Sequence, residues 1–98
     1  MCLVGGIRSM PRLDLLIGNK LGLHARASAK LTKLASEFDS EVWLSKGSRK
    51  VNAKSIMGVM MLAAGQGTRL VVEADGADAE QALAAIDALV RDKFGEGE

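Results

Sequence analysis

The chain has few of the residues that build disulfide frameworks, zinc sites or aromatic surfaces. Its 98 residues include one Cys, one His, one Pro, one Trp, two Phe and no Tyr. A single Cys, Cys2, excludes an internal disulfide and is typical of a reducing compartment. With one His as well, the chain lacks the ligand set of a zinc site, so we expect no metal. Three aromatic side chains are too few for the base-stacking surfaces of RNA-binding proteins.

Long apolar runs and a strong net charge are also missing. No stretch approaches the roughly 20 apolar residues that span a bilayer, and the first residues lack the apolar middle of a signal peptide. The net charge of +1 is too small to draw the protein to DNA or to membranes. The length and the 48% content of apolar residues suit one core. We therefore expect a small cytoplasmic domain that neither inserts into membranes nor binds nucleic acid.

The charges are divided unevenly along the chain. Residues 1–54 contain ten Lys and Arg against four Asp and Glu, whereas residues 55–98 contain three against eight. An ordinary solvated surface is the simpler interpretation. A basic face that binds an anion or an acidic partner is the alternative, and the fold must decide between them.

Hydrophobic periodicity predicts seven elements in the order β-α-β-β-α-β-α. Strands are expected around residues 13–17, 42–44, 49–52 and 70–74, and helices over residues 27–38, 55–62 and 78–94. Asp78 with Gln81 three residues later resembles a capping box, and Gly95 is expected to end the last helix. This order predicts an α+β fold with helices on one face of an antiparallel sheet.

His24 is the first candidate for a chemical role, in the string GLHARASAKL. It precedes a predicted helix, whose first turn has unpaired N–H groups and favours a bound anion. A neutral imidazole is a nucleophile, and Arg26 can donate charge-assisted hydrogen bonds to phosphate oxygens. The alternative is a loop histidine that is bonded to the backbone or solvated.

Ser55 is the second candidate and opens the short helix in NAKSIMGVMML. A serine at this position ordinarily caps the helix; a regulatory phosphorylation site is the alternative. Ile56, Met57 and Met60 could belong to the core or form an adaptable docking patch. Because Val59 and Leu62 can face the sheet instead, we expect a helix that is part core and part patch.

The strings NKLGLHARASAKL and NAKSIMGVMMLAAGQGT, followed by a Gly-Ala-Asp turn, resemble the HPr family. Its members are histidine-containing phosphocarriers of the bacterial phosphoenolpyruvate-dependent phosphotransferase system. The resemblance runs from about Met10 to the C-terminus. It implies one domain at residues 10–98, with residues 1–9 as an N-terminal extension. It also implies an open-faced β-sandwich of four antiparallel strands with three helices on one face, and we expect a monomer without a cofactor.

The resemblance further implies roles for individual residues. His24 would take a phosphoryl group on Nδ1 from phosphorylated enzyme I and pass it to a histidine of an EIIA-type protein, with Arg26 assisting. Ser55 matches the serine that HPr kinase/phosphorylase modifies in many relatives. Ile56, Met57 and Met60 match the apolar positions that dock enzyme I and acceptors. The protein would be a covalent carrier rather than an enzyme with its own turnover.

Ala27 departs from the family pattern, which has proline directly after the arginine. Proline in the first turn presets helix geometry, so Ala27 leaves the transfer rate and partner preference open; we group it with the docking residues. The strings HARAS and Asn19-Lys20-Leu21 resemble regulatory or nitrogen-linked branches of the family. Sugar uptake and regulation therefore both stay open as outputs, as does a Ser55-dependent interaction module. A domain that binds small ligands or RNA is the third alternative.

Overall fold

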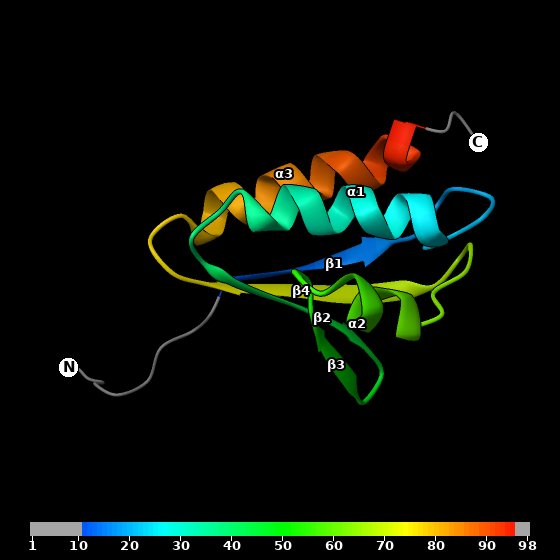
Figure 1. Ribbon diagram of the computed structural model, residues 1–98, viewed down its shortest axis with the longest axis horizontal. Coiled ribbons are helices and arrows are strands. Elements are labelled where there is room, and N and C mark those ends of the chain that lie inside the picture. Colours follow the sequence, from blue (N-terminus) through cyan, green and yellow to red (C-terminus); the bar gives the residue numbers. More distant parts are fainter. Residues whose placement is uncertain (1–10, 96–98) are drawn as a thin grey trace.

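Four strands form one antiparallel sheet, and three helices cover one of its faces (Figure 1). The computed structural model describes residues 11–95, so Cys2 and the predicted extension at residues 1–9 lie outside the described residues. The elements in chain order are β1 (Arg12–Leu16), α1 (Ala25–Ser36), β2 (Glu41–Lys46), β3 (Arg49–Asn52), α2 (Ile56–Met61), β4 (Arg69–Asp75), α3 (Ala79–Arg91) and the 3-10 turn η1 (Lys93–Gly95). The predicted open-faced β-sandwich is confirmed.

The strands lie in the order β1-β4-β2-β3, and neighbouring strands are antiparallel. Register places Leu13, Val72, Leu44 and Val51 in one row across all four strands. Val72 and Leu44, in the two central strands, are completely buried, whereas Leu13 on the edge strand is 38% exposed. The period-two alternation therefore directs one side of the sheet toward the helices.

The uncovered face of the sheet carries a small cluster of charged residues. Glu73 lies at its centre and forms ion pairs with Lys50 at 3.3 Å and with Arg12 at 3.9 Å. The Lys50 ammonium also lies 5.6 Å from the centre of the Trp43 ring, a cation–π distance. These contacts join β1, β4, β2 and β3 on the side away from the helices.

Helices α1 and α3 lie side by side over the sheet (Figure 1). Most residues of their predicted apolar stripes are buried: Ala27, Leu31 and Ala35 from the first stripe and Ala82, Leu83, Ile86 and Val90 from the second. The other members, Leu34, Phe38 and Leu89, are partly buried. Within residues 11–95 no helix has the length and apolar character needed to cross a membrane.

The end of the last helix differs from the prediction. Helix α3 stops at Arg91, four residues before Gly95, and η1 follows. Phe94 adopts a left-handed backbone conformation, with φ of 57°, and its side chain is completely buried. Burying a phenylalanine contributes roughly 1.5–3 kcal/mol, which offsets much of the cost of two left-handed residues, Lys93 and Phe94, at about 1–2 kcal/mol each. Core packing thus ends the helix before the glycine does.

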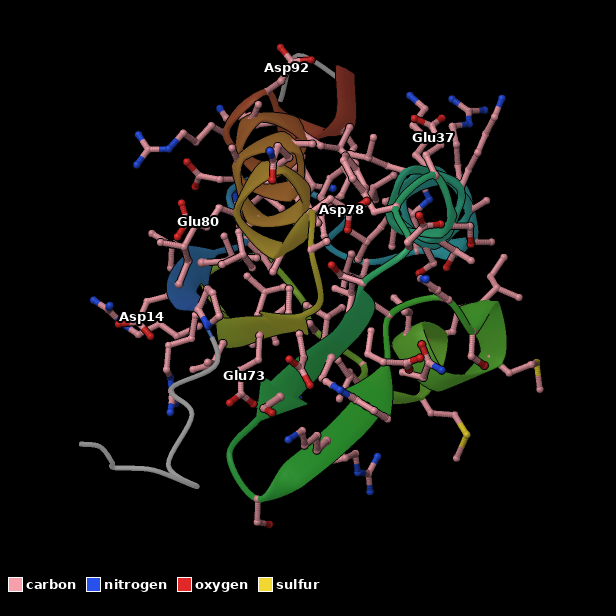
Figure 2. The ribbon with its side chains drawn as sticks, turned by 90° about the vertical axis from the view of Figure 1, so that its left-hand side faces the viewer. Asp14, Glu37, Glu73, Asp78, Glu80 and Asp92 are labelled. Atoms are coloured by element: carbon pink, nitrogen blue, oxygen red, sulfur yellow. The ribbon has the colours of Figure 1, made fainter. Side chains whose placement is uncertain are left out.

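The predicted capping box at the start of α3 is also wrong. Asp78 occupies the N-cap position, but its carboxylate accepts from the backbone N–H groups of Asp39 and Ser40, both at 2.9 Å, and from the Ser40 hydroxyl. Figure 2 shows Asp78 between α3 and α1. The hydrogen bond from the Ser40 hydroxyl, followed by that from the Asp39 amide, holds the pKa of Asp78 below its ordinary value. The carboxylate therefore ties the turn between α1 and β2 to the start of α3.

Candidate functional site

The loop that leads to His24 is seated against the chain that follows α2. The Leu23 amide donates to the Ala64 carbonyl at 2.8 Å, and the Asn19 side-chain amide donates to the Gly22 carbonyl at 2.8 Å. Gly22 has φ of +66°, and a Cβ there would lie 2.4 Å from the Ala64 oxygen. Only glycine fits this approach, so the backbone in front of His24 is held in one place.

His24 is the N-cap residue of α1. Its backbone is extended, with φ of −74° and ψ of −179°, and its carbonyl accepts from the Ser28 amide at 2.8 Å. As far as residues 11–95 show, the His24 ring makes no capping hydrogen bond to the helix, and the first turn contains no acidic side chain. The first amides of a helix have no intrahelical acceptor and form its positive end. The imidazole therefore lies beside a helix end that favours an anion.

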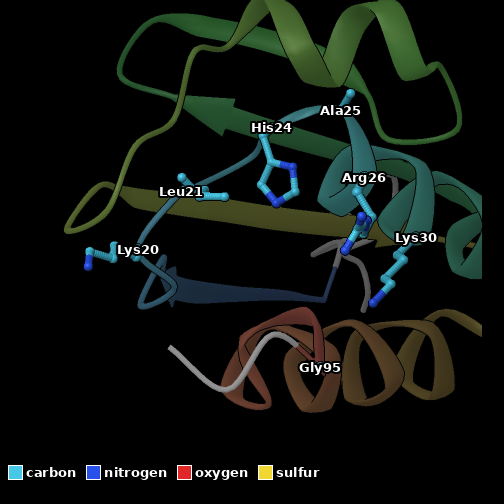
Figure 3. Close-up of a pocket in the computed structure, with 7 residues that line it drawn as sticks. All are labelled: Lys20, Leu21, His24, Ala25, Arg26, Lys30 and Gly95. Atoms are coloured by element: carbon cyan, nitrogen blue, oxygen red, sulfur yellow. The ribbon is translucent and has the colours of Figure 1, made fainter.

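An open surface depression of about 650 Å³ surrounds this helix start (Figure 3). It is lined by Lys20, Leu21, His24, Ala25, Arg26, Lys30 and Gly95. Three of these residues are cationic and none is acidic. Figure 3 shows the His24 ring projecting between Leu21 and Arg26. A dianionic group attached to this ring would enter a cationic environment.

The sequence interpretation found His24 and Arg26 but missed Lys20, Leu21, Lys30 and Gly95. Lys30 lies four residues after Arg26, a spacing that places both on one helix face, so this signal was available. No local pattern indicated Gly95, because it lies near the opposite end of the described chain and meets the depression only in the folded protein.

Several basic side chains of the first half are bonded to the carboxyl ends of helices. Lys46, Arg49 and Lys54 donate to the carbonyls of Leu62, Met61 and Phe38 at 3.0, 2.7 and 2.8 Å, respectively. Cations at these ends satisfy unpaired carbonyls and oppose the negative end of the helix dipole. The basic residues of the first half thus have several uses. These three bond to helix ends, Arg12 and Lys50 pair with Glu73, and Lys20, Arg26 and Lys30 line the depression.

Ser55 is the N-cap residue of α2, as predicted. Its hydroxyl accepts from the Gly58 amide at 3.2 Å, and the residue is exposed. The capping role is confirmed. Phosphorylation of Ser55 stays a prediction.

The exposed apolar residues of α2 form a patch on the surface. Ile56, Met57 and Met60 are 40%, 68% and 41% exposed, and Met61, which the sequence interpretation missed, is 63% exposed. We call these four residues the α2 patch. Val59 and Leu62 are buried in the core, so the expected division of this helix is confirmed.

Ala27 does not belong with the docking residues in this structure. Its side chain is completely buried in the core. A buried methyl group has no surface to offer a partner, so the grouping of Ala27 with the patch is corrected. Ala27 lies in the first turn of α1, at the position where the resemblance led us to expect proline.

Comparisons with known proteins agree with this geometry. The family described as PTS HPr component phosphorylation site matches residues 12–92. The phosphocarrier protein HPr of Cupriavidus necator is 58% identical over 89 residues, which cover 91% of this chain and all of the relative. The phosphocarrier protein HPr of Neisseria meningitidis serogroup A is 59% identical over 80 residues, which cover 82% of this chain and 90% of the relative. The crystal structure of HPr-C-His from Thermoanaerobacter tengcongensis superposes with a TM-score of 0.86 at 46% identity, and the match covers 89% of this chain and 98% of that one. The chain therefore belongs to the HPr family of phosphocarriers.

Proposed function

We propose that the chain accepts a phosphoryl group on Nδ1 of His24 from phosphorylated enzyme I and passes it to a histidine of an EIIA-type protein. The observation that carries this proposal is the position of His24 at the positive end of α1, in a depression lined by Lys20, Arg26 and Lys30. Membership of the HPr family supports the same role.

The transfer needs little machinery on the carrier itself. The lone pair of the neutral imidazole attacks phosphorus, a P–N bond forms, and the bond to the donor atom of enzyme I breaks with its electron pair on the donor. The phosphoryl charge is stabilised by the first amides of α1 and by the Arg26 guanidinium. Transfer to the acceptor reverses these steps, with the imidazole as leaving group.

The α2 patch is the proposed contact for both partners. Enzyme I and an EIIA-type protein must each reach His24, so one surface beside it serves them in turn. Methionine side chains are flexible and repack against different surfaces. Three of the four residues of the α2 patch are methionines, Met57, Met60 and Met61, which suits a surface that binds two different partners.

Intact-mass spectrometry tests the carrier proposal. The wild-type chain, incubated with phosphoenolpyruvate and enzyme I, is expected to gain one acid-labile phosphoryl group, and His24→Ala is expected to gain none. The control is an enzyme I preparation that phosphorylates another HPr. An unlabelled wild type, or a His24→Ala variant that is still labelled, would contradict the proposal.

Regulation at Ser55 is a second candidate function. The exposed hydroxyl at the start of α2 supports modification by an HPr kinase/phosphorylase. A phosphate there would add about −1.5 to −2 charges next to the α2 patch. Incubation with such a kinase and ATP should add an acid-stable phosphate to the wild type but not to Ser55→Ala; equal labelling of both would eliminate this site.

A further inference from the structure

Lys30 connects two distant parts of the chain beside His24. Its ammonium group donates to the carbonyl of Phe94 at 2.6 Å, across 64 residues of sequence. Lys30 lies on α1, one turn after Arg26, and Phe94 lies in η1, after the end of α3. This charge-assisted hydrogen bond therefore attaches the last described turn to the helix that begins at His24.

The turn that Lys30 holds has an unfavourable backbone. Lys93, Phe94 and Gly95 have φ of 54°, 57° and 75°, so three consecutive residues are left-handed. Two of them are not glycine and resist this conformation. The observed attachments are the buried Phe94 ring and the bond from Lys30. Burial in the core fixes the ring of Phe94, and the hydrogen bond from Lys30 fixes its carbonyl group. This carbonyl belongs to the peptide bond that joins Phe94 to Gly95.

The position of Gly95 matters because it is part of the lining of the His24 depression. Figure 3 shows it across the depression from the His24 ring, with Lys30 reaching toward it from α1. A Cβ on Gly95 would lie 3.5 Å from the Lys30 nitrogen, so the ammonium lies on the side of the turn to which a side chain at this position would point. The Lys30 bond is the polar contact that joins this wall of the depression to α1, beside the packing of the Phe94 ring in the core.

We propose that Lys30 is a positioning residue that keeps the turn at Phe94 and Gly95 against the depression and thereby limits the access of water to phosphorylated His24. The proposal rests on the proposed function of His24. The reaction that it slows is hydrolysis: a water oxygen bonds to phosphorus, and the P–N bond breaks with its electron pair on the imidazole. Inorganic phosphate leaves, and a proton from the water passes to solvent. A carrier benefits because the phosphoryl group persists until an acceptor arrives.

The test measures the first-order hydrolysis of purified phosphorylated protein by intact mass, without partners present. Lys30→Met keeps the aliphatic stem but loses the donor, and Lys30→Arg retains a donor. Lys54→Met is the matched control, because Lys54 makes an equivalent bond to the Phe38 carbonyl at the far end of α1. Lys30→Met is expected to hydrolyse about fivefold faster, the factor that corresponds to losing one intramolecular hydrogen bond. Lys30→Arg and Lys54→Met are expected to hydrolyse at the wild-type rate.

Two further measurements separate positioning from other roles. Steady-state transfer from enzyme I should show a lower kcat for Lys30→Met at unchanged KM if the wall, rather than the docking surface, has changed. The hydrolysis ratio between Lys30→Met and wild type should be insensitive to added salt, since salt screens direct charge interactions more strongly than hydrogen bonds that position a wall. A ratio that collapses in salt would overturn positioning in favour of direct contact with the phosphoryl group.

The remaining outcomes are also decisive. Equal hydrolysis rates for Lys30→Met and Lys54→Met would overturn the inference, as would a Lys30→Arg variant that hydrolyses as fast as Lys30→Met. If circular dichroism shows that Lys30→Met is unfolded, Lys30→Gln takes its place in the same comparison. A wild type that acquires no phosphoryl group would instead refute the proposed function of His24, so the two failures are distinguishable.

Discussion

The starts of α1 and α2 make use of the same backbone arrangement in opposite ways. His24 and Ser55 are both N-cap residues with extended backbones, at ψ of −179° and 113°. The Ser55 hydroxyl satisfies an amide of its own helix, at 3.2 Å. Within residues 11–95, the side chain of His24 makes no such capping hydrogen bond to α1. One helix start is capped by its N-cap side chain, whereas the other has the His24 imidazole beside its first amides.

The start of α3 is a third case. Asp78 has a side chain that caps helices well, yet its carboxylate binds the turn at Asp39 and Ser40. The N-cap side chain can thus stabilise its own helix, join another segment, or leave the amides available for a ligand.

Replacing the N-cap residue of α1 has the largest expected effect. His24→Ser removes the nucleophile and supplies a hydroxyl that can accept from an amide of the first turn. We expect complete loss of acid-labile phosphorylation together with a gain in unfolding free energy of about 0.5–1 kcal/mol. Intact mass and urea denaturation measure the two effects. A less stable variant would show that the ring of His24 contributes more to the helix start than its geometry indicates.

Adding charge to the closed start of α2 should impair transfer. Ser55→Asp places a carboxylate beside the α2 patch, where it has to be desolvated when a partner docks. We expect transfer from enzyme I to slow several-fold, mainly through a higher KM. Stopped phosphotransfer assays over a range of carrier concentrations measure this, and Ser55→Asn is the neutral control. An unchanged rate would argue against docking at this patch.

Removing the carboxylate at α3 should change the pH dependence of stability. Because the folded-state pKa of Asp78 is lowered from 3.8, its contribution is complete above the unfolded pKa and is lost as the pH falls through the folded pKa. Asp78→Asn should therefore lower the melting temperature at neutral pH by several degrees. Its deficit in melting temperature should shrink as the pH falls below about 4. A difference in melting temperature between Asp78→Asn and the wild type that stays constant as the pH falls would contradict the lowered pKa of Asp78.

Removing the cap of α2 has the smallest expected effect. Ser55→Ala deletes the acceptor of the Gly58 amide and should lower the unfolding free energy by about 1 kcal/mol. Urea denaturation measures this change, with Ser48→Ala in the exposed β2–β3 turn as the control. Equal stability of the two variants would mean that water replaces the cap without cost.

Sequence reasoning worked where the determining interactions are local. The order of elements and the apolar stripes follow from periodicity, because burial repeats every two residues in a strand and every 3.6 in a helix. His24 and Ser55 were identified at helix starts for the same reason, since capping depends on residues within one turn. Val59 and Leu62 were correctly assigned to the core from their spacing.

The errors at both ends of the last helix involve contacts between distant segments. The capping box failed because Asp39 and Ser40 compete for the Asp78 carboxylate from 38 or 39 residues away. The last helix ended early because Phe94 enters a core that only the assembled sheet and helices create.

The sequence by itself determined the secondary structure, the family and the two helix starts that carry His24 and Ser55, because each is encoded within a short stretch of chain. Only the tertiary structure decided what surrounds His24. It placed Gly95 in the depression and bonded Lys30 to Phe94, and it buried Ala27. These outcomes depend on how α1, α3 and the sheet pack together, and a local pattern contains no information about which distant surface it will meet.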